Sequence, residues 1–266
     1  MKKQTKLFEK QFIRARNAIE RKGISMAKAA LTAQYNAFLE RAKTTDFRQW
    51  KEIVESAVTE QPIQQFMNRY YPMSSTLAVM VRKNMLKGKA ETEEDKIYNS
   101  VFQTKLTQYL NDTKKEAIRK ITNTTQEALR KVINDVLDQA DTEGWGIDKI
   151  TSNLYKQAKQ NLIGNGYARA RAIAQTEVIS ASNKASEFAA QSTGYEYLKF
   201  WSTSGLPGIR ESHLFAERYS NQKDGLKQNE LFDMGDGTFM KFPGDPEGTP
   251  ENVINCRCVL MHEIVW

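Results

Sequence analysis

Hydrophobic positions recur at helical spacing through most of the first 190 residues. One helix face is formed by Trp50, Ile53, Val54, Ala57 and Val58. Asp46 stands where the N-cap of that helix is expected. The helix should end before Pro62, and the apolar period continues beyond it to Pro72. Residues 75–86 fit a further helix, whereas residues 4–43 fit two helices broken near Gly23. The pattern predicts a long helical N-terminal region.

The most regular stretch is 91–140, which contains no proline and begins with Glu91, an acidic residue that suits the positive end of a helix. A continuous helix of about 45 residues would be about 68 Å long, and it would have to pair with another long helix, another subunit or a large assembly. A break near 111–113, which gives two stacked helices, fits the pattern equally well.

Glycine and proline are concentrated near the C-terminus, with eight glycines and four prolines in residues 191–266. This predicts short strands and turns, including strands over 195–203 and about 256–265 and a hairpin at Gly235-Asp236-Gly237. Before them, Asp148 can cap a helix over 150–163. Gly164-Asn165-Gly166 ends that helix, and another follows over 167–190.

We therefore expect an α+β fold with two domains. A long helical, basic N-terminal region, 1–143, serves as an arm that faces DNA or an assembly partner. A small mixed domain, 144–266, contains two helices and a short antiparallel sheet.

Positive charge is concentrated in the first half of the chain. Residues 1–140 contain 26 Lys and Arg against 16 Asp and Glu, whereas residues 141–266 contain 13 against 16. A basic half can lie against nucleic acid or an acidic partner, or it can be a lysine-rich surface that keeps the protein in solution. No run of about 18 apolar residues exists, so no membrane span is expected, and no apolar segment of a secretory signal follows the basic start.

The chain has two cysteines, Cys256 and Cys258, and two histidines, His213 and His262. Placed on one strand, cysteines two residues apart point to the same face about 6.7 Å apart, which is too far for a relaxed disulfide. They can be buried apolar side chains, half of a zinc site, a redox pair or a catalytic thiol. Zinc needs four ligands, and His262 on the same strand gives poor tetrahedral geometry. We expect structural cysteines in a reducing cytoplasm and no bound metal, with Cys256, Cys258 and His213 as weak candidate ligands.

A line of polar residues follows one face of the helix over 167–190: Thr176, Ser180, Asn183 and Glu187, with Glu177 beside it. Such a line faces water or makes polar contacts with another element. The glycine-rich turns lack the residues of phosphate-binding loops, and no pair of carboxylates is distinguished by its spacing. No catalytic residue and no cofactor are expected.

Several short motifs occur in a fixed order between about residues 145 and 262. They are Arg171-Ala172-Ile173-Ala174-Gln175-Thr176-Glu177 with Asn183, Phe200-Trp201 with Arg210-Glu211-Ser212-His213, Pro243-Gly244-Asp245-Pro246, and Ile254-Asn255-Cys256-Arg257-Cys258-Val259-Leu260. In this order they resemble the phage Mu F-like minor head proteins, also called phage head morphogenesis proteins. The first 140 residues carry no such resemblance.

The chain departs from that family's pattern at three places. Gln175 stands where family members often have Arg, Arg210 and His213 replace a Cys-x-x-Cys, and Val253-Ile254 replaces a His-Pro. The cysteine-rich form of the family looks able to bind zinc, but this chain lacks most of those ligands. We expect a structural cluster instead, in which hydrogen bonds and charges tie turns to the C-terminal strand: Arg210, His213, Asp245, Asn255, Cys256, Arg257 and Cys258.

The resemblance implies a minor capsid protein of the virion. It would lie inside the head, reach it from the host cytoplasm during assembly, and assist head assembly and genome packaging or delivery. Its implied partners are the portal protein, the major capsid protein, and packaged double-stranded DNA for the basic region. Two alternatives stay open: a nonspecific DNA-binding protein, and an enzyme or toxin-like domain, because some family members are fused to toxin domains.

Overall fold

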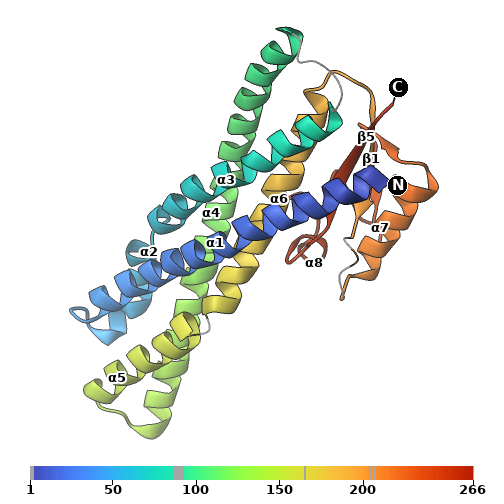
Figure 1. Cartoon of the computed structure of the whole chain (residues 1–266). Coiled ribbons are helices and arrows are strands. Elements are labelled where there is room, and N and C mark those ends of the chain that lie inside the picture. The colour runs from blue at the N-terminus through green and yellow to red at the C-terminus, as the bar shows by residue number, and fades with distance from the viewer. Residues whose placement is uncertain (1–2, 87–92, 165, 204, 206–207, 266) are drawn as a thin grey trace. The chain divides into compact units, whose positions relative to one another are not determined.

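The computed structural model describes residues 3–86, 93–164, 166–203, 205 and 208–265 (Figure 1). Long helices come first in the chain, and a small region with short antiparallel strands follows. The expected α+β class is confirmed. None of the described helices combines the length and the apolar character that a membrane span needs.

The first helix, α1 (Lys3–Ala42), is continuous, so the expected break near Gly23 is wrong. Glycine in a helix interior costs about 1 kcal/mol relative to alanine. Gly23 is buried, as are Ile19 and Ala27 one turn before and after it on the same face. Packing of this face outweighs the local preference of glycine.

Asp46 is a cap, as predicted, but of the short 3-10 helix η1 (Phe47–Gln49), where its carboxylate accepts a hydrogen bond of 2.9 Å from the Arg48 amide. Helix α2 (Trp50–Ala57) follows.

Helix α3 (Gln61–Met85) passes through Pro72, where two separate helices were expected. Proline inside a helix costs about 3 kcal/mol. The two residues before it, Tyr70 and Tyr71, are buried, and their packing offsets that cost.

Helix α4 (Glu93–Glu143) is also continuous, without a break at 111–113, because that stretch holds no glycine or proline. The expected start at Glu91 lies outside the described residues.

Helix α5 (Ile147–Gln157) begins earlier than predicted, with Gly146 as its N-cap. Asp148 therefore lies in the first turn and not at the cap. A π-helical segment, η2 (Ala158–Gly164), precedes α6 (Gly166–Gln191). The predicted helix end thus falls at Gly164, and Asn165 lies outside the described residues.

The C-terminal region contains five short strands and two helices among its described residues: β1 (Tyr197–Ser202), α7 (Glu211–Gln222), β2 (Leu226–Lys227), β3 (Phe232–Asp233), β4 (Phe239–Met240), α8 (Pro250–Val253) and β5 (Val259–Ile264). Strand β1 lies between β2 and β5, antiparallel to both, and Tyr197 pairs with Ile264. The predicted hairpin forms between β3 and β4, whereas β2 was not predicted.

The chain divides into two compact units. Unit 1 contains residues 1–22, 70–113 and 174–266, and unit 2 contains residues 23–69 and 114–173. Each unit joins segments that are far apart in sequence, and the boundary expected at residue 143 falls inside unit 2.

Unit 2 encloses a buried polar network. The Gln34 amide donates to the Thr122 hydroxyl at 3.2 Å and accepts from the Thr125 hydroxyl at 3.0 Å. The Arg169 guanidinium donates to Thr125 at 3.0 Å and to the Tyr35 hydroxyl at 2.7 Å. The sequence motifs from Ala174 onward belong to unit 1.

Candidate metal centre

Helix α6 is the platform on which the C-terminal segment lies. One alanine-rich face is buried, and Asn183 and Glu187 of the polar line are buried with it. Glu177 accepts a hydrogen bond of 2.5 Å from the Tyr71 hydroxyl, and the buried Ser180 hydroxyl has no partner among the described residues. The polar line therefore makes contacts between elements, and its members Ser180, Asn183 and Glu187 are buried.

Asn255 forms the turn that brings the two cysteines onto α6. Its φ of 57° lies in the left-handed region, which asparagine tolerates better than most residues. Its backbone N–H donates to the Thr176 hydroxyl at 3.2 Å, and its backbone carbonyl accepts from the Gln175 side-chain amide at 2.9 Å. Arg257, two residues later, donates to the side-chain oxygen of Gln175 at 3.2 Å.

Asn183 ties three backbone segments together. Its amide nitrogen donates to the carbonyl of Pro243 at 2.8 Å and to that of Cys258 at 3.2 Å, and its oxygen accepts from the Leu260 amide at 3.0 Å. Gly244 allows this close approach, because a Cβ at its φ of 76° would lie 2.9 Å from the Ile179 side chain. The glycine turn and the start of β5 are thus fixed to α6 by one buried amide.

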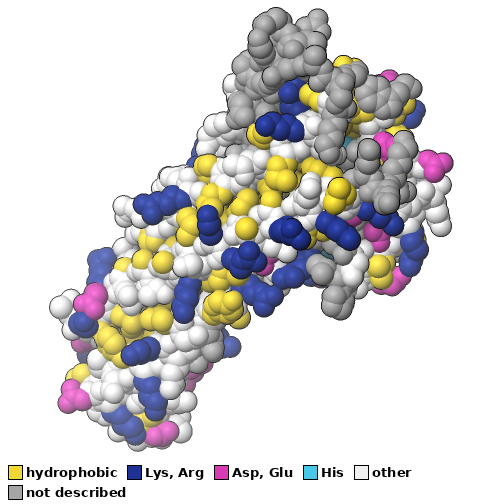
Figure 2. Space-filling model, in the orientation of Figure 1, with side chains coloured by type: hydrophobic (Ala, Val, Ile, Leu, Met, Phe, Trp, Pro, Cys, Tyr) yellow, Lys and Arg dark blue, Asp and Glu magenta, His cyan; other side chains and the backbone are white. Residues whose placement is uncertain are grey.

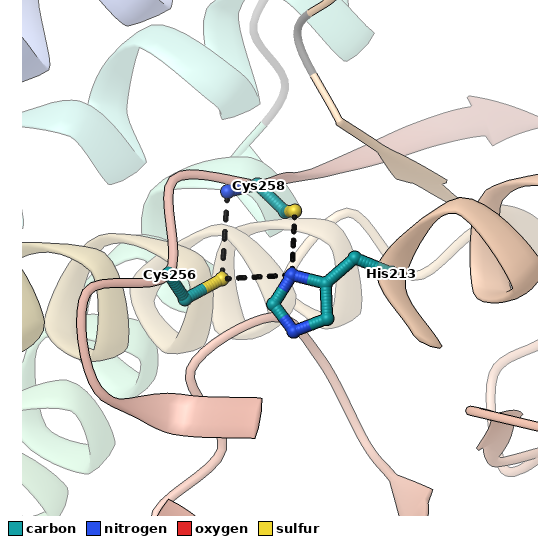
Figure 3. A group of neighbouring side chains, drawn as sticks. All are labelled: His213, Cys256 and Cys258. Carbon is teal, nitrogen blue, oxygen red and sulfur yellow. Dashed lines mark hydrogen bonds between the residues drawn. The ribbon is translucent and has the colours of Figure 1, made fainter. Parts of the chain in front are cut away.

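His213, Cys256 and Cys258 meet in the interior of unit 1 (Figure 3). His213 comes from α7, and the cysteines come from the segment between α8 and β5. The His213 Nδ1 atom lies 3.3 Å from the Cys258 sulfur and 3.9 Å from the Cys256 sulfur, and all three atoms lie within 4.8 Å of one another. The expected position of both cysteines on the strand is wrong, because β5 begins only at Val259. The turn at Asn255 removes the wide same-face spacing that a strand would impose.

The orientation of the His213 ring is fixed from its other side. Its Nε2 atom lies 3.1 Å from the Asn252 carbonyl oxygen. A carbonyl only accepts, so Nε2 carries the proton and Nδ1 presents a lone pair to both sulfurs in the neutral ring. Asn252 is itself held by Asp236 at 2.8 Å and by Ser212 at 2.7 Å, and Trp201 packs edge-on against the His213 ring.

A buried arginine lies next to the sulfurs. Arg16 of α1 donates to the Cys258 carbonyl at 3.3 Å, and its Nε atom has no partner among the described residues. Burial lowers the pKa of Arg16 to about 10, and nearby Cys256 and Glu20 act against this decrease.

The pKa values of the two thiols shift in opposite directions. Donation from the Cys258 thiol outweighs burial and holds the pKa of Cys256 well below its ordinary value. Donation to Cys256, together with burial, raises the pKa of Cys258. The Cys258 backbone amide also donates to the Cys256 sulfur at 3.4 Å.

Arg210, Asp245 and Arg257 of the expected structural cluster make separate contacts. Arg210 is the N-cap residue of α7 and donates to the Ile254 carbonyl at 2.5 Å. Asp245 accepts from the backbone amides of Lys241 and Glu247 at 2.9 and 3.2 Å. In the part of the chain that the structure describes, Asp245 forms no ion pair with Arg210 or Arg257, because its carboxylate closes its own turn. Asp245 therefore does not join the arginines, whereas Arg210 ties the start of α7 to the turn before the cysteines.

Arg257 instead lies 3.6 Å from the Glu20 carboxylate of α1.

The second histidine forms a separate centre that sequence reasoning missed. His262 of β5 donates from Nε2 to the Glu187 carboxylate at 3.1 Å, and the Tyr197 hydroxyl donates to the same carboxylate at 3.0 Å. Burial raises the pKa of Glu187, but the hydrogen bond and charge of His262 outweigh it, so the net shift is downward. Glu187 ended the predicted polar line, and its partner could have been sought among the buried polar residues of the last strand.

Comparisons of the chain with family models, with curated proteins and with solved structures gave no match.

Proposed function

We propose that the chain is a phage minor head protein that lies inside the capsid, associates with the portal or major capsid protein, and assists head assembly and genome packaging or delivery. The proposal rests on the motif order described above. One observation on the structure supports treating those motifs as a set. Gln175, Thr176 and Asn183 of α6 contact the Pro243 turn and the segment 255–258 through hydrogen bonds.

These contacts suggest what the motif residues do. They close the C-terminal segment onto α6 and so stabilise unit 1, which is the role expected of an anchor in an assembly. Long helices such as α1 and α4 then supply surface for partners, since a helix can bind along a groove of another protein.

The test is the composition of purified heads. In the phage whose genome encodes this chain, procapsids and mature heads separated on a gradient should contain the chain in few copies, detected by mass spectrometry. Added protease should leave it intact until the heads are opened. Deletion of its gene should reduce DNA-filled heads while leaving the major capsid protein abundant. Absence of the chain from both kinds of particle would exclude the proposal.

Nonspecific DNA binding is the second candidate, and it is favoured by a basic stripe on α1. Exposed cations at spacings of four, four and seven residues share one face of this helix: Lys6, Lys10, Arg14 and Arg21. Of the acidic residues in α1, Glu20 is buried and pairs with Arg257. Many Lys and Arg side chains are also visible on the face shown in Figure 2.

A salt titration separates the two candidates. If the stripe binds DNA phosphates, the affinity for DNA falls steeply with salt. When all four cations are changed to Gln, the negative slope of log K against log salt should become less steep by about 3 to 4. Four exposed Lys and Arg residues of unit 2 changed in the same way serve as a charge-matched control. The head-protein role alone is favoured if the chain is retained on a portal ring at moderate salt without DNA. In that case the four-cation variant should have the same salt dependence as the wild type.

A further inference from the structure

The three side chains of the His213 group have the spacing of a metal site. In a tetrahedral zinc site with bonds of about 2.3 Å to sulfur and about 2.05 Å to nitrogen, sulfur and nitrogen lie about 3.6 Å apart and two sulfurs about 3.8 Å apart. The two sulfur–nitrogen distances, 3.3 and 3.9 Å, lie on either side of this value, and the sulfurs are within 4.8 Å of each other. We propose that His213, Cys256 and Cys258 bind a single Zn²⁺ ion.

The surroundings of the group fit this ligand set. Zinc-bound histidines usually donate their second ring N–H to a carbonyl or carboxylate, as His213 does to the Asn252 carbonyl. The Cys258 amide donates to the Cys256 sulfur, a contact that suits a thiolate. Zinc binds thiolates, and the buried Arg16 guanidinium beside the cysteines favours their negative form.

Burial and composition select a thiophilic ion. His213, Cys256 and Cys258 are each about 2% exposed or less, and two sulfurs with one imidazole suit zinc and not calcium or magnesium. No fourth Cys, His, Asp or Glu atom joins the group among the described residues, so the proposed ion has three ligands from these side chains. The site takes one ligand from helix α7 through His213, and both cysteines follow the turn at Asn255. It does not depend on the proposed role in the phage head.

The main alternatives are an inert buried group and a disulfide between Cys256 and Cys258. In the structure both sulfurs lie near one atom, His213 Nδ1, and both cysteines are free thiols. A common neighbour is what a shared ion requires, whereas a disulfide requires the two sulfurs to bond to each other at about 2.05 Å.

The first test is the zinc content of the full chain, purified in reducing buffer and dialysed extensively, measured by elemental analysis. The wild type should contain close to one zinc per chain and two free thiols after denaturation in chelator. The His262→Gln variant, which changes the other buried histidine, should keep its zinc. The His213→Gln and the double Cys256→Ala, Cys258→Ala variants should keep only traces.

The second test uses Co²⁺ in place of zinc and a substitution that exchanges one ligand for another. Cobalt bound to the wild type should give sulfur-to-cobalt charge-transfer absorption and the intense visible bands of a four-coordinate ion. His213→Cys should restore stoichiometric metal with stronger charge-transfer absorption, since a third sulfur replaces the nitrogen. A purely structural histidine predicts neither result.

Three outcomes would overturn the proposal. The first is folded wild-type protein that contains only traces of zinc and gives no charge-transfer band with Co²⁺. The second is a Cys256–Cys258 disulfide in protein kept under reducing conditions. The third is stoichiometric zinc that persists in the double alanine variant, because the ion would then bind elsewhere. The wild-type measurements decide the proposal even if a variant fails to fold.

Discussion

The two histidines of the chain lie in the same unit and are both buried, yet their surroundings differ. His262 donates to the carboxylate of Glu187, which also accepts from Tyr197, and its Nδ1 has no partner among the described residues. His213 has neighbours at both ring nitrogens: a carbonyl that fixes its tautomer and two sulfurs that face its lone pair.

The difference shows how partners decide what a buried imidazole can do. The Glu187 carboxylate accepts directly from the His262 Nε2 atom, and this hydrogen bond fixes β5 to α6. Two thiols beside a lone pair form a ligand set, which a cation completes. Asn183 lies between the two centres along the C-terminal segment, bonded to Cys258 and Leu260.

The largest effect is expected from Asn183→Ala. The change leaves the Pro243 carbonyl and the Leu260 amide without a partner and the Cys258 carbonyl with Arg16 alone, at about 1–3 kcal/mol for an unsatisfied group, so we expect a loss of about 4 kcal/mol. Denaturant unfolding measures the loss. The matched control is Asn153→Ala, whose amide makes one exposed bond, with an expected change within about 0.5 kcal/mol. Equal effects of the two variants would show that Asn183 does not join the centres.

The His262 centre should weaken in acid. Glu187→Gln removes the buried charge and should cost about 3 kcal/mol at pH 7. Because the pKa of folded Glu187 lies below its ordinary value of 4.5, its charge stabilises the fold above about pH 4.5 and ceases to do so as the pH falls through the folded pKa.

The stability difference between wild type and Glu187→Gln should therefore shrink on acidification, as measured by denaturant unfolding at several pH values. Glu116→Gln, which breaks an exposed ion pair with Lys120, is the control with a small effect. A difference that stays constant down to pH 3 would contradict the role given to Glu187.

The stability contributed by the His213 centre should depend on bound zinc, and therefore on chelation, and not on the charge of Glu187. If zinc is present at about 100 times its dissociation constant, it contributes about 2.7 kcal/mol, so removing it with a strong chelator lowers the melting temperature by several degrees. His262→Gln should show the same decrease on chelation, whereas the Cys256→Ala, Cys258→Ala variant should show none. If the chelator also lowered the melting temperature of the double variant, the decrease would not come from this centre, and the prediction would be contradicted.

The smallest effect is expected from Arg257→Ala. Its guanidinium is partly exposed and makes an ion pair of 3.6 Å with Glu20 and one bond to Gln175. Its loss should lower the unfolding free energy by about 0.5–1 kcal/mol without changing the zinc content. Loss of zinc in this variant would mean that Arg257 positions the cysteines.

Local features of the sequence predicted local structure well. The β3–β4 hairpin and helix α6 were predicted because glycine turns and helical spacing act over a few residues. The continuity of α1 at Gly23 and of α3 at Pro72 was missed because burial outweighed residue preference. Such packing arises from distant segments.

The candidate site was predicted only in its parts. Cys256, Cys258 and His213 were named as weak ligands, but an assumed strand kept the cysteines apart. Asn255 gave a usable signal, since asparagine tolerates the left-handed turn found there. The approach of His213 and of Arg16 depends on tertiary packing across many residues, which no local pattern encodes.

A crystal of the full chain, grown under reducing conditions without added metal and measured on both sides of the zinc absorption edge, tests the difference between the two histidines most directly. We predict one anomalous peak within bonding distance of His213 Nδ1 and both sulfurs, and none at His262. A well-ordered structure with no peak beside His213, or with a peak at another place in the chain, would contradict it.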